Sequence, residues 1–199
     1  MRRFMIAGLL VVFLAIFTVF TGASGQSHRQ PTQQLPKAKQ TKLELYMTAE
    51  EAYKKWKADP HKAWVIDVRT PEEYIFIGHA EMAWNIPFAF QTYQWDVNKQ
   101  YFAIKPNLDF VSQMKGLAKP VDTILVMCRS GGRSAAAVNL LAEAGFTNVY
   151  NIIDGMEGDT VDDLESVFHG KRMKNGWKNS GLPWTYDLNP EQMRLPKRQ

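Results

Sequence analysis

The sequence predicts a single α/β domain with a mainly parallel central sheet flanked by helices. Three short apolar segments rich in β-branched residues, 63–68, 123–127 and 148–152, are typical of buried strands. Helical patterns lie between them, and strands that alternate with helices favour an α/β fold with a parallel sheet. No internal repeat is visible, and the expected folded part, residues 43–196, has the length of one domain.

Helix boundaries can also be predicted. Residues 48–51 form a capping box that opens a helix towards Ala58, where Asp-Pro follows and ends it. Residues 70–73 form a second capping box, with Pro71 at the first helical position. A third helical pattern covers residues 107–117. Its apolar face consists of Leu108, Val111, Met114 and Leu117.

The only cysteine, Cys128, lies between the strand of residues 123–127 and a strong helix-forming segment, residues 135–144. Gly145 closes that helix at the expected position. The residues after the cysteine are Arg129, Ser130, Gly131, Gly132, Arg133 and Ser134. Two glycines allow a tight turn whose N–H groups point inward, and the helix start and the arginines add positive charge. All of these favour the nucleophilic thiolate, so we interpret the heptapeptide as a working site rather than an inert buried thiol.

Further motifs surround the loop. Residues 65–74 read Val-Ile-Asp-Val-Arg-Thr-Pro-Glu-Glu-Tyr, followed by Gly-His at 78–79 and Asn-Ile-Pro at 85–87. Residues 176–183 end in Trp-Lys-Asn-Ser-Gly-Leu-Pro. Together with the Cys-Arg-x-Gly start of the loop, these motifs resemble the rhodanese superfamily of single-domain sulfurtransferases, in the family's order. The resemblance spans about residues 43–183.

The resemblance implies sulfur transfer in two steps through a covalent intermediate. The Cys128 thiolate would attack the outer sulfur of a small anionic donor such as thiosulfate and become a persulfide. A thiophilic acceptor, cyanide in a test tube or a thiol in the cell, would then remove that sulfur. Residues 129–134 would bind the substrate: Arg129 and Arg133 would attract the anion, while the Ser130 and Ser134 hydroxyls would bind it or cap the helix.

The position of the second arginine separates two chemistries. Cysteine-dependent phosphatases use Cys-x5-Arg, which places an arginine at the sixth position to clamp phosphate. The sixth position after Cys128 is Ser134, and Arg133 stands at the fifth. A shorter loop favours the smaller terminal sulfur of a persulfide, provided that the loop ends where the helical pattern begins. A small phosphatase and a non-enzymatic sulfur carrier that docks on an exported partner stay open as alternatives.

Asp67 and Arg69 end the strand of residues 63–68. We expect them near the loop, because open α/β sheets place their sites at the carboxyl ends of strands. Two roles stay open for them, contact with the substrate and a structural ion pair that ties the strand end to the fold.

The N-terminus predicts export. Arg2-Arg3 precede an uncharged apolar run of 17 residues, 4–20, and small residues follow. This order is typical of a signal peptide, residues 1–25, cleaved before Gln26, and predicts a periplasmic location. The alternative is an uncleaved membrane anchor, for which 17 residues is the lower limit. No second cysteine can pair with Cys128, so the fold must rely on its hydrophobic core.

The basic charge is confined to one end. The chain has a formal net charge of +4, but residues 1–42 hold six Lys and Arg and no acid, which leaves 18 basic and 20 acidic residues beyond them. Residues 26–42 are rich in Gln, Pro, Lys and Ser and read as a flexible linker. The sequence therefore gives nucleic-acid binding little support.

Two insertions interrupt the family pattern. The first, at about 88–106, is rich in aromatic residues, which we expect to cover one edge of the core; a lid or docking surface beside Cys128 is the alternative. The second, at about 159–175, is polar and follows several acids without the spacing of a calcium loop, so a solvated loop is expected. The histidines are scattered, and we expect no metal and no cofactor. They are His28, His61, His79 and His169.

Overall fold

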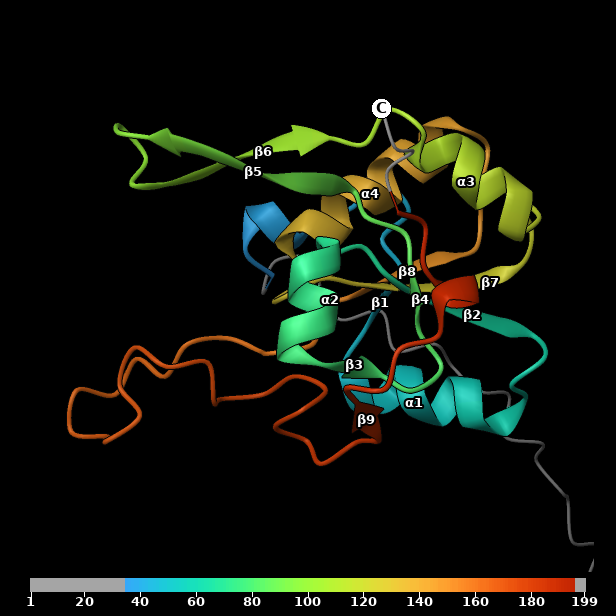
Figure 1. Ribbon diagram of the computed structural model, residues 1–199. Helices are drawn as coiled ribbons and strands as arrows, with labels where there is room; N and C mark the ends of the chain where they lie inside the picture. Colours follow the sequence, from blue (N-terminus) through green and yellow to red (C-terminus); the bar gives the residue numbers. More distant parts are fainter. Residues whose placement is uncertain (1–34, 196–199) are drawn as a thin grey trace, which may run out of the picture.

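The computed structural model describes residues 35–195, which form a central sheet with helices on both sides (Figure 1). All neighbouring strands of this five-stranded sheet are parallel. In spatial order they are β1 (Tyr46–Met47), β8 (Val149–Ile152), β7 (Thr123–Met127), β2 (Ala63–Asp67) and β4 (Trp84–Asn85). The predicted fold class is therefore confirmed, and the three predicted strands form the middle of the sheet.

Within the described part of the chain, four α-helices cover the sheet. They are α1 (Ala49–Ala58), α2 (Pro71–Ile77), α3 (Phe110–Leu117) and α4 (Gly132–Glu143). Side chains alternate between the faces of a strand, so Leu125 and Met127 of β7 join the core under α1, while Ile124 and Val126 join the core under α3 and α4. Cys128 belongs to the second core, which places it on the α4 side of the sheet.

Both predicted capping boxes are present. The Thr48 hydroxyl accepts the Glu51 backbone N–H at 3.3 Å, and the Glu51 carboxylate accepts the Thr48 N–H at 2.8 Å. Thr70 and Glu73 repeat this exchange at the start of α2, with Pro71 in the first turn. These local bonds satisfy donors that would otherwise be left free at the helix start.

The predicted helix at residues 107–117 begins later than its pattern. α3 starts at Phe110, and Leu108, which was expected on the buried face, is 90% exposed. The reason is Asn107, whose side chain donates to the Pro87 carbonyl at 2.8 Å and accepts the Asp109 N–H at 3.1 Å. Such local side-chain bonds compete with helix formation, so the first turn is replaced by a loop.

Residues 35–42, which the sequence assigns to the linker, pack against the domain. They include the short 3-10 helix η2 (Lys37–Lys39), and the Lys39 ammonium pairs with Asp159 at 2.7 Å. The Lys42 N–H donates to Asn139 of α4 at 2.7 Å. The predicted signal and residues 26–34 of the linker lie outside the described residues. Within residues 35–195 no helix is long and apolar enough to cross a membrane.

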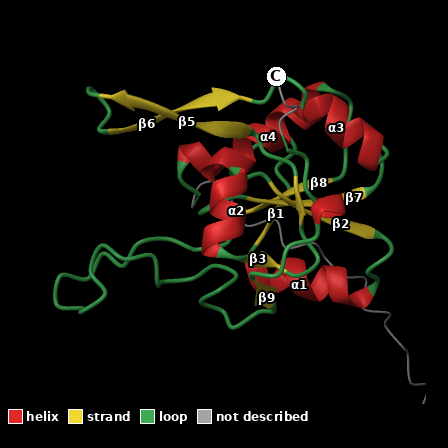
Figure 2. Ribbon diagram, in the orientation of Figure 1, coloured by secondary structure: helices red, strands yellow, loops and turns green. Residues whose placement is uncertain are grey.

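The first insertion is a projecting hairpin of β5 (Ala89–Asp96) and β6 (Tyr101–Pro106) (Figure 2). Phe88 at its base contacts Phe110 with ring centroids 5.6 Å apart, as expected of a ring on the core edge. The expectation is wrong for the outer rings, because a two-stranded ribbon that extends from the body has no core to cover. The exposed rings are Tyr93, Trp95, Tyr101 and Phe102.

The second insertion is an irregular excursion, closed at its base by bridges between Thr160 and Arg172 and between Val161 and His169. It projects on the same side of the molecule as the hairpin (Figure 1). The chain then returns to the body, where Trp177 is fully buried. The remaining elements are β3 (His79–Ala80), which pairs with β9 (Trp184–Thr185), and the 3-10 helix η3 (Pro190–Gln192).

Candidate active site

Cys128 directly follows β7, at the carboxyl edge of the parallel sheet, and is 1% exposed. A neighbouring segment holds its backbone, since the Met156 N–H donates to the Cys128 carbonyl at 2.8 Å. Gly155, in the left-handed region at φ +62°, allows that approach: a Cβ there would lie 2.4 Å from the Cys128 carbonyl oxygen. The nucleophile is thus placed by two segments that are distant in the sequence.

The sulfur faces one hydrogen-bond donor of its loop and the oxygen of a serine in α4. The Gly131 N–H donates to Cys128 Sγ at 3.2 Å, and the Ser134 hydroxyl lies 3.4 Å from the same atom. Gly131 has φ +95°, and a Cβ there would lie 2.3 Å from the Ile153 carbonyl oxygen, so only glycine fits. The Gly131 N–H stabilises negative charge on the sulfur, whereas the Ser134 hydroxyl donates its one hydrogen to Asn151.

The helix after the loop begins earlier than the sequence pattern indicates. α4 starts at Gly132 rather than at residue 135, so Arg133 and Ser134 lie in its first turn. The loop proper is therefore limited to residues 128–131, and the sulfur lies close to the N-terminus of a 12-residue helix. The partial positive charge of that end favours an anion at this place.

Ser134 and Asn151 form a buried polar network beneath the sulfur. The Asn151 side-chain amide donates to the carbonyls of Gly131 at 3.1 Å and of Lys39 at 3.0 Å. Two carbonyl partners fix the amide nitrogen, so its oxygen faces Ser134 and accepts the hydroxyl at 2.6 Å. Asn151 was not predicted as a site residue, although a polar residue in a buried strand signals that its side chain is needed for hydrogen bonds.

The two arginines that follow Cys128, Arg129 in the loop and Arg133 in α4, have different surroundings. Arg133 donates two hydrogen bonds of 2.6 Å to the Glu73 carboxylate. Burial would raise the pKa of Glu73, but the bonds and charge of Arg133 outweigh it and hold that pKa below its usual value. Arg129 is exposed, and no ion pair or side-chain hydrogen bond joins it to another residue within 35–195. Ser130 is half-buried and completes the loop.

Asp67 and Arg69 form a fully buried ion pair at the carboxyl end of β2. Arg69 Nη2 donates to Asp67 Oδ2 at 2.6 Å and to the Gly78 carbonyl at 2.8 Å. Burial would lower the pKa of Arg69, but the charge of Asp67 and its hydrogen bonds raise it. Asp67 lies opposite Met127 in the sheet register, so the Asp67–Arg69 ion pair lies beside the loop, as expected. Through the bond of Arg69 to the Gly78 carbonyl, the ion pair ties the end of β2 to the end of α2.

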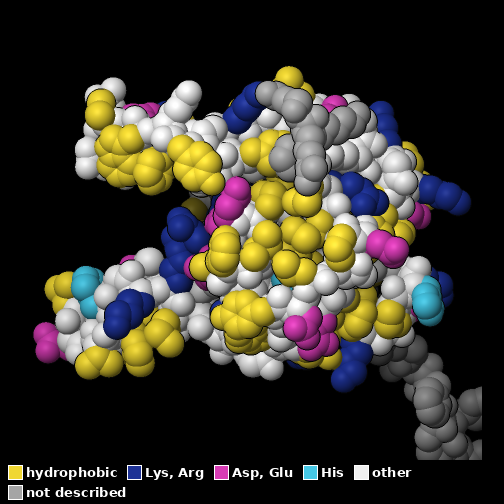
Figure 3. Space-filling model, in the orientation of Figure 1, with side chains coloured by type: hydrophobic (Ala, Val, Ile, Leu, Met, Phe, Trp, Pro, Cys, Tyr) yellow, Lys and Arg dark blue, Asp and Glu magenta, His cyan; other side chains and the backbone are white. Residues whose placement is uncertain are grey.

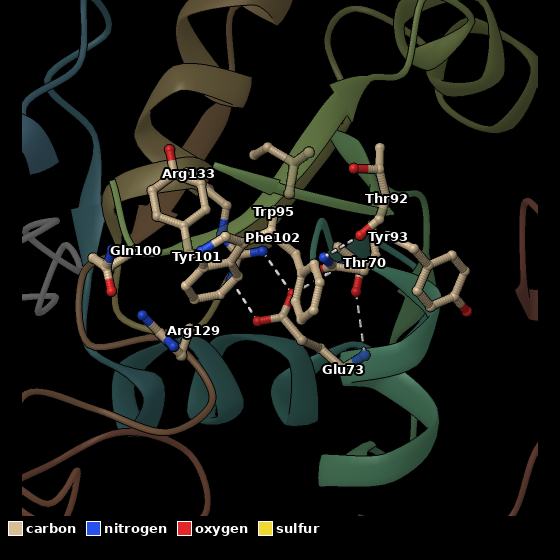
Figure 4. Close-up of a pocket in the computed structure, with 12 residues that line it drawn as sticks. Thr70, Glu73, Thr92, Tyr93, Trp95, Gln100, Tyr101, Phe102, Arg129 and Arg133 are labelled. Atoms are coloured by element: carbon tan, nitrogen blue, oxygen red, sulfur yellow. Dashed lines mark hydrogen bonds and ion pairs between the residues drawn. The ribbon is translucent and has the colours of Figure 1, made fainter. Parts of the chain in front are cut away.

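A pocket of about 670 Å³ lies between the loop and the hairpin (Figure 4). One side is bordered by Arg129 of the loop, by Arg133 in the first turn of α4, and by Thr70 and Glu73 at the start of α2. Side chains of the hairpin border it on the other, among them Tyr93, Trp95, Tyr101, Phe102 and Ile104. Glu73 was known from the sequence only as a capping residue, since nothing local signals its contact with Arg133.

The fold and the loop define an α/β protein with a cysteine site suited to nucleophilic chemistry on small anions. Within the described range, 35–195, no group of three His, Cys, Asp or Glu side chains is placed to hold a metal ion. Residues 48–160 match the rhodanese-like domain family. The chain belongs to this family, which confirms the resemblance drawn from the motifs.

Relatives and a solved structure agree with this. RP600 of Rickettsia prowazekii, described as uncharacterised, is 33% identical over 129 residues, which cover 63% of this chain and 85% of that protein. Thiosulfate sulfurtransferase 16, a chloroplastic protein of Arabidopsis thaliana, is 40% identical over 90 residues, 45% of this chain and 68% of that protein. The crystal structure of Rv0390 from M. tuberculosis is similar with a TM-score of 0.55 and 27% identity, over 71% of this chain and 96% of that one.

Proposed function

We propose that this protein is a sulfurtransferase that moves sulfane sulfur from a donor such as thiosulfate to a thiophilic acceptor through a persulfide on Cys128. The single observation that carries the proposal is the contact of the Gly131 N–H with Cys128 Sγ, 3.2 Å long, at the start of α4. Negative charge on sulfur is favoured there without a general base. The sulfurtransferase name of the Arabidopsis relative supports the same activity.

In the first step the Cys128 thiolate attacks the outer sulfur of thiosulfate. The sulfur–sulfur bond of thiosulfate breaks, and sulfite leaves with the bonding electron pair. The outer sulfur is then bonded to Cys128 and carries the negative charge, which the loop N–H groups and the start of α4 stabilise. Arg129, exposed and without an ion-pair partner in residues 35–195, attracts the donor.

In the second step the acceptor attacks the outer sulfur of the persulfide. The bond to the Cys128 sulfur breaks, its electron pair stays on Cys128 as the thiolate, and the acceptor leaves with the sulfur.

The pairing of Arg133 with Glu73 through two hydrogen bonds disfavours the phosphatase alternative. An arginine held in this way has fewer donors left to clamp a phosphate group.

Intact-mass measurement after incubation with thiosulfate tests the proposal. We expect the pure protein to gain one sulfur atom that cyanide removes, and the Cys128→Ser variant to gain none. Continuous turnover with cyanide or a thiol distinguishes an enzyme from a sulfur carrier that only delivers its sulfur to a partner protein. Hydrolysis of a phosphate ester without any sulfur adduct would overturn the proposal.

We further propose that the protein is exported to the periplasm. The support is the order of basic, apolar and small residues in positions 1–25. Mass spectrometry of the protein from cell fractions tests this, and we expect a mature chain that begins at Gln26 in the periplasmic fraction. An intact Met1 recovered with membranes would instead indicate an anchored protein that faces the periplasm.

A further inference from the structure

The β5–β6 hairpin presents aromatic rings that the domain does not need for its core. Trp95 and Phe102 lie opposite each other on the two strands. Their ring centroids are 5.2 Å apart, and the angle between the ring planes is 76°. Nevertheless both are about half exposed, at 49% and 48%. Figure 3 shows hydrophobic side chains gathered along the side of the hairpin that faces the 159–175 excursion. Clustered exposed rings of this kind mark binding surfaces.

These rings form one wall of the pocket at the active loop. The pocket volume, about 670 Å³, lies within the range of sites for small organic molecules. Trp95, Tyr101 and Phe102 line the same pocket as Arg129 and Arg133, and Figure 4 shows all five side chains around it. A molecule held here would therefore touch rings with one part and the loop with another.

The charge of the loop side selects an anion. Arg129, Arg133 and Glu73 are the charged residues of the pocket lining. Glu73 is bound to Arg133 through both of its oxygens, so these two charges offset each other. Arg129 remains as the net positive charge, and it adjoins Cys128 in the chain. The complementary ligand is amphipathic, with an aromatic or apolar body and an anionic group.

We propose that this pocket binds the sulfur acceptor, and that the acceptor is a small organic thiol with an aromatic group and a carboxylate. The proposal rests on the proposed sulfur transfer and names its acceptor class. Thiosulfate has no apolar part, so the rings offer nothing to the donor. In the transfer the acceptor thiolate attacks the outer persulfide sulfur, the Cys128 thiolate leaves, and an organic persulfide is released.

Two acceptors that differ only by a phenyl group test the proposal. The protein is loaded with thiosulfate and then titrated with 2-mercapto-3-phenylpropionate or with 2-mercaptopropionate, which share the thiol and the carboxylate. We expect a KM about tenfold lower for the phenyl compound, since a ring packed against rings contributes at this level. Trp95→Ala should abolish the difference. Val97→Ala, a change in the hairpin turn outside the pocket lining, should preserve it.

A second variant separates binding from hairpin stability. Trp95→Ala also removes the partner of Phe102, whereas Tyr101→Leu leaves that ring pair intact and should still raise the KM of the phenyl compound alone. Isothermal titration of Cys128→Ser with 3-phenylpropionate, which has no thiol, measures binding without sulfur chemistry. We expect saturable binding that Tyr101→Leu weakens.

The possible failures are distinguishable. Normal sulfur loading with equal KM values for the two thiols would overturn the proposed acceptor class and leave the proposed function intact. It would indicate that the pocket binds something else, such as a segment of another protein. Binding of 3-phenylpropionate without any sulfur loading would overturn the acceptor role together with the proposed function.

Discussion

Arg133 and Glu73 are joined by two hydrogen bonds of 2.6 Å, although 60 residues separate them in the chain. Arg133 lies in the first turn of α4 and Glu73 in the first turn of α2. The same carboxylate accepts the Thr70 N–H at 3.1 Å and completes the capping box. The Glu73 side chain thus connects the start of α2 to the start of α4, next to the active loop, through charge-assisted bonds that are stronger than neutral ones.

Replacement of Glu73 by Gln should lower the free energy of unfolding by about 1–3 kcal/mol at pH 7, because charged hydrogen bonds are lost. Arg133 holds the pKa of Glu73 below its usual value against the effect of burial. This stabilisation is therefore complete above the unfolded pKa of about 4.3 and disappears as the pH falls through the folded pKa. Urea unfolding at pH 7 and pH 3 measures it. The exposed neighbour Glu72→Gln is the control, and a loss of equal size at both pH values would contradict the prediction.

Replacement of Gly131 by Ala should prevent normal sulfur loading. Its new Cβ would lie 2.3 Å from the Ile153 carbonyl oxygen, so the loop must shift and the Gly131 N–H leaves the sulfur. Gly145→Ala is a matched control, because its φ of +93° is almost the same as the +95° of Gly131 but nothing lies within 4 Å of the added Cβ. In both variants, alanine in the left-handed region costs about 1 kcal/mol of folding stability. Equal persulfide yields by intact mass would refute the argument.

Replacement of Asn151 by Asp should slow persulfide formation and destabilise the fold by about 1–3 kcal/mol. A carboxylate cannot donate to the Gly131 and Lys39 carbonyls, and it adds negative charge beneath the sulfur. Rapid chemical quenching of the reaction with thiosulfate measures the rate of persulfide formation, and thermal unfolding measures the stability. Asn148→Asp, at the other end of the sheet, should affect stability without changing the rate. An unchanged rate of persulfide formation in Asn151→Asp would show that Asn151 has no role in the reaction.

Replacement of Arg69 by Met should lower the free energy of unfolding by about 3–5 kcal/mol, since it leaves the Asp67 carboxylate buried without its partner. Guanidinium unfolding measures this. The Lys42–Glu143 pair offers a comparison, because both of its side chains are more than half exposed and Lys42→Met should change stability little. A small effect of Arg69→Met would mean that the pair is not what ties β2 to α2.

Replacement of Arg129 by Gln should raise the KM for thiosulfate about tenfold with little change in stability, because the variant removes the net charge at the loop. The effect should shrink as salt concentration rises. Lys105→Gln removes the same charge from the hairpin outside the pocket lining, and steady-state kinetics should show no such change for it. An equal KM shift in both variants would indicate general attraction by surface charge.

The features that could be predicted depend on neighbours in the chain. The capping boxes at Thr48 and Thr70 are four-residue patterns, and both appear as expected. The strand before Cys128 and the closing Gly145 follow from propensity and backbone freedom in the same way. A local effect also explains why the predicted start of α3 was wrong. The Asn107 side chain bonds to the Pro87 carbonyl and the Asp109 N–H, and these bonds replace the first helical turn.

By itself the sequence determined the α/β class and the place of Cys128 between a strand and a helix, because backbone preferences act over a few residues. Only the tertiary structure decided that Arg133 is paired with Glu73, while Arg129 has no ion-pair partner among the described residues, 35–195. It also decided that Asn151 supports the loop and that the rings of the hairpin face a pocket rather than the core. These contacts join residues distant in the chain, and the packing of whole elements, which no local pattern encodes, brings them together.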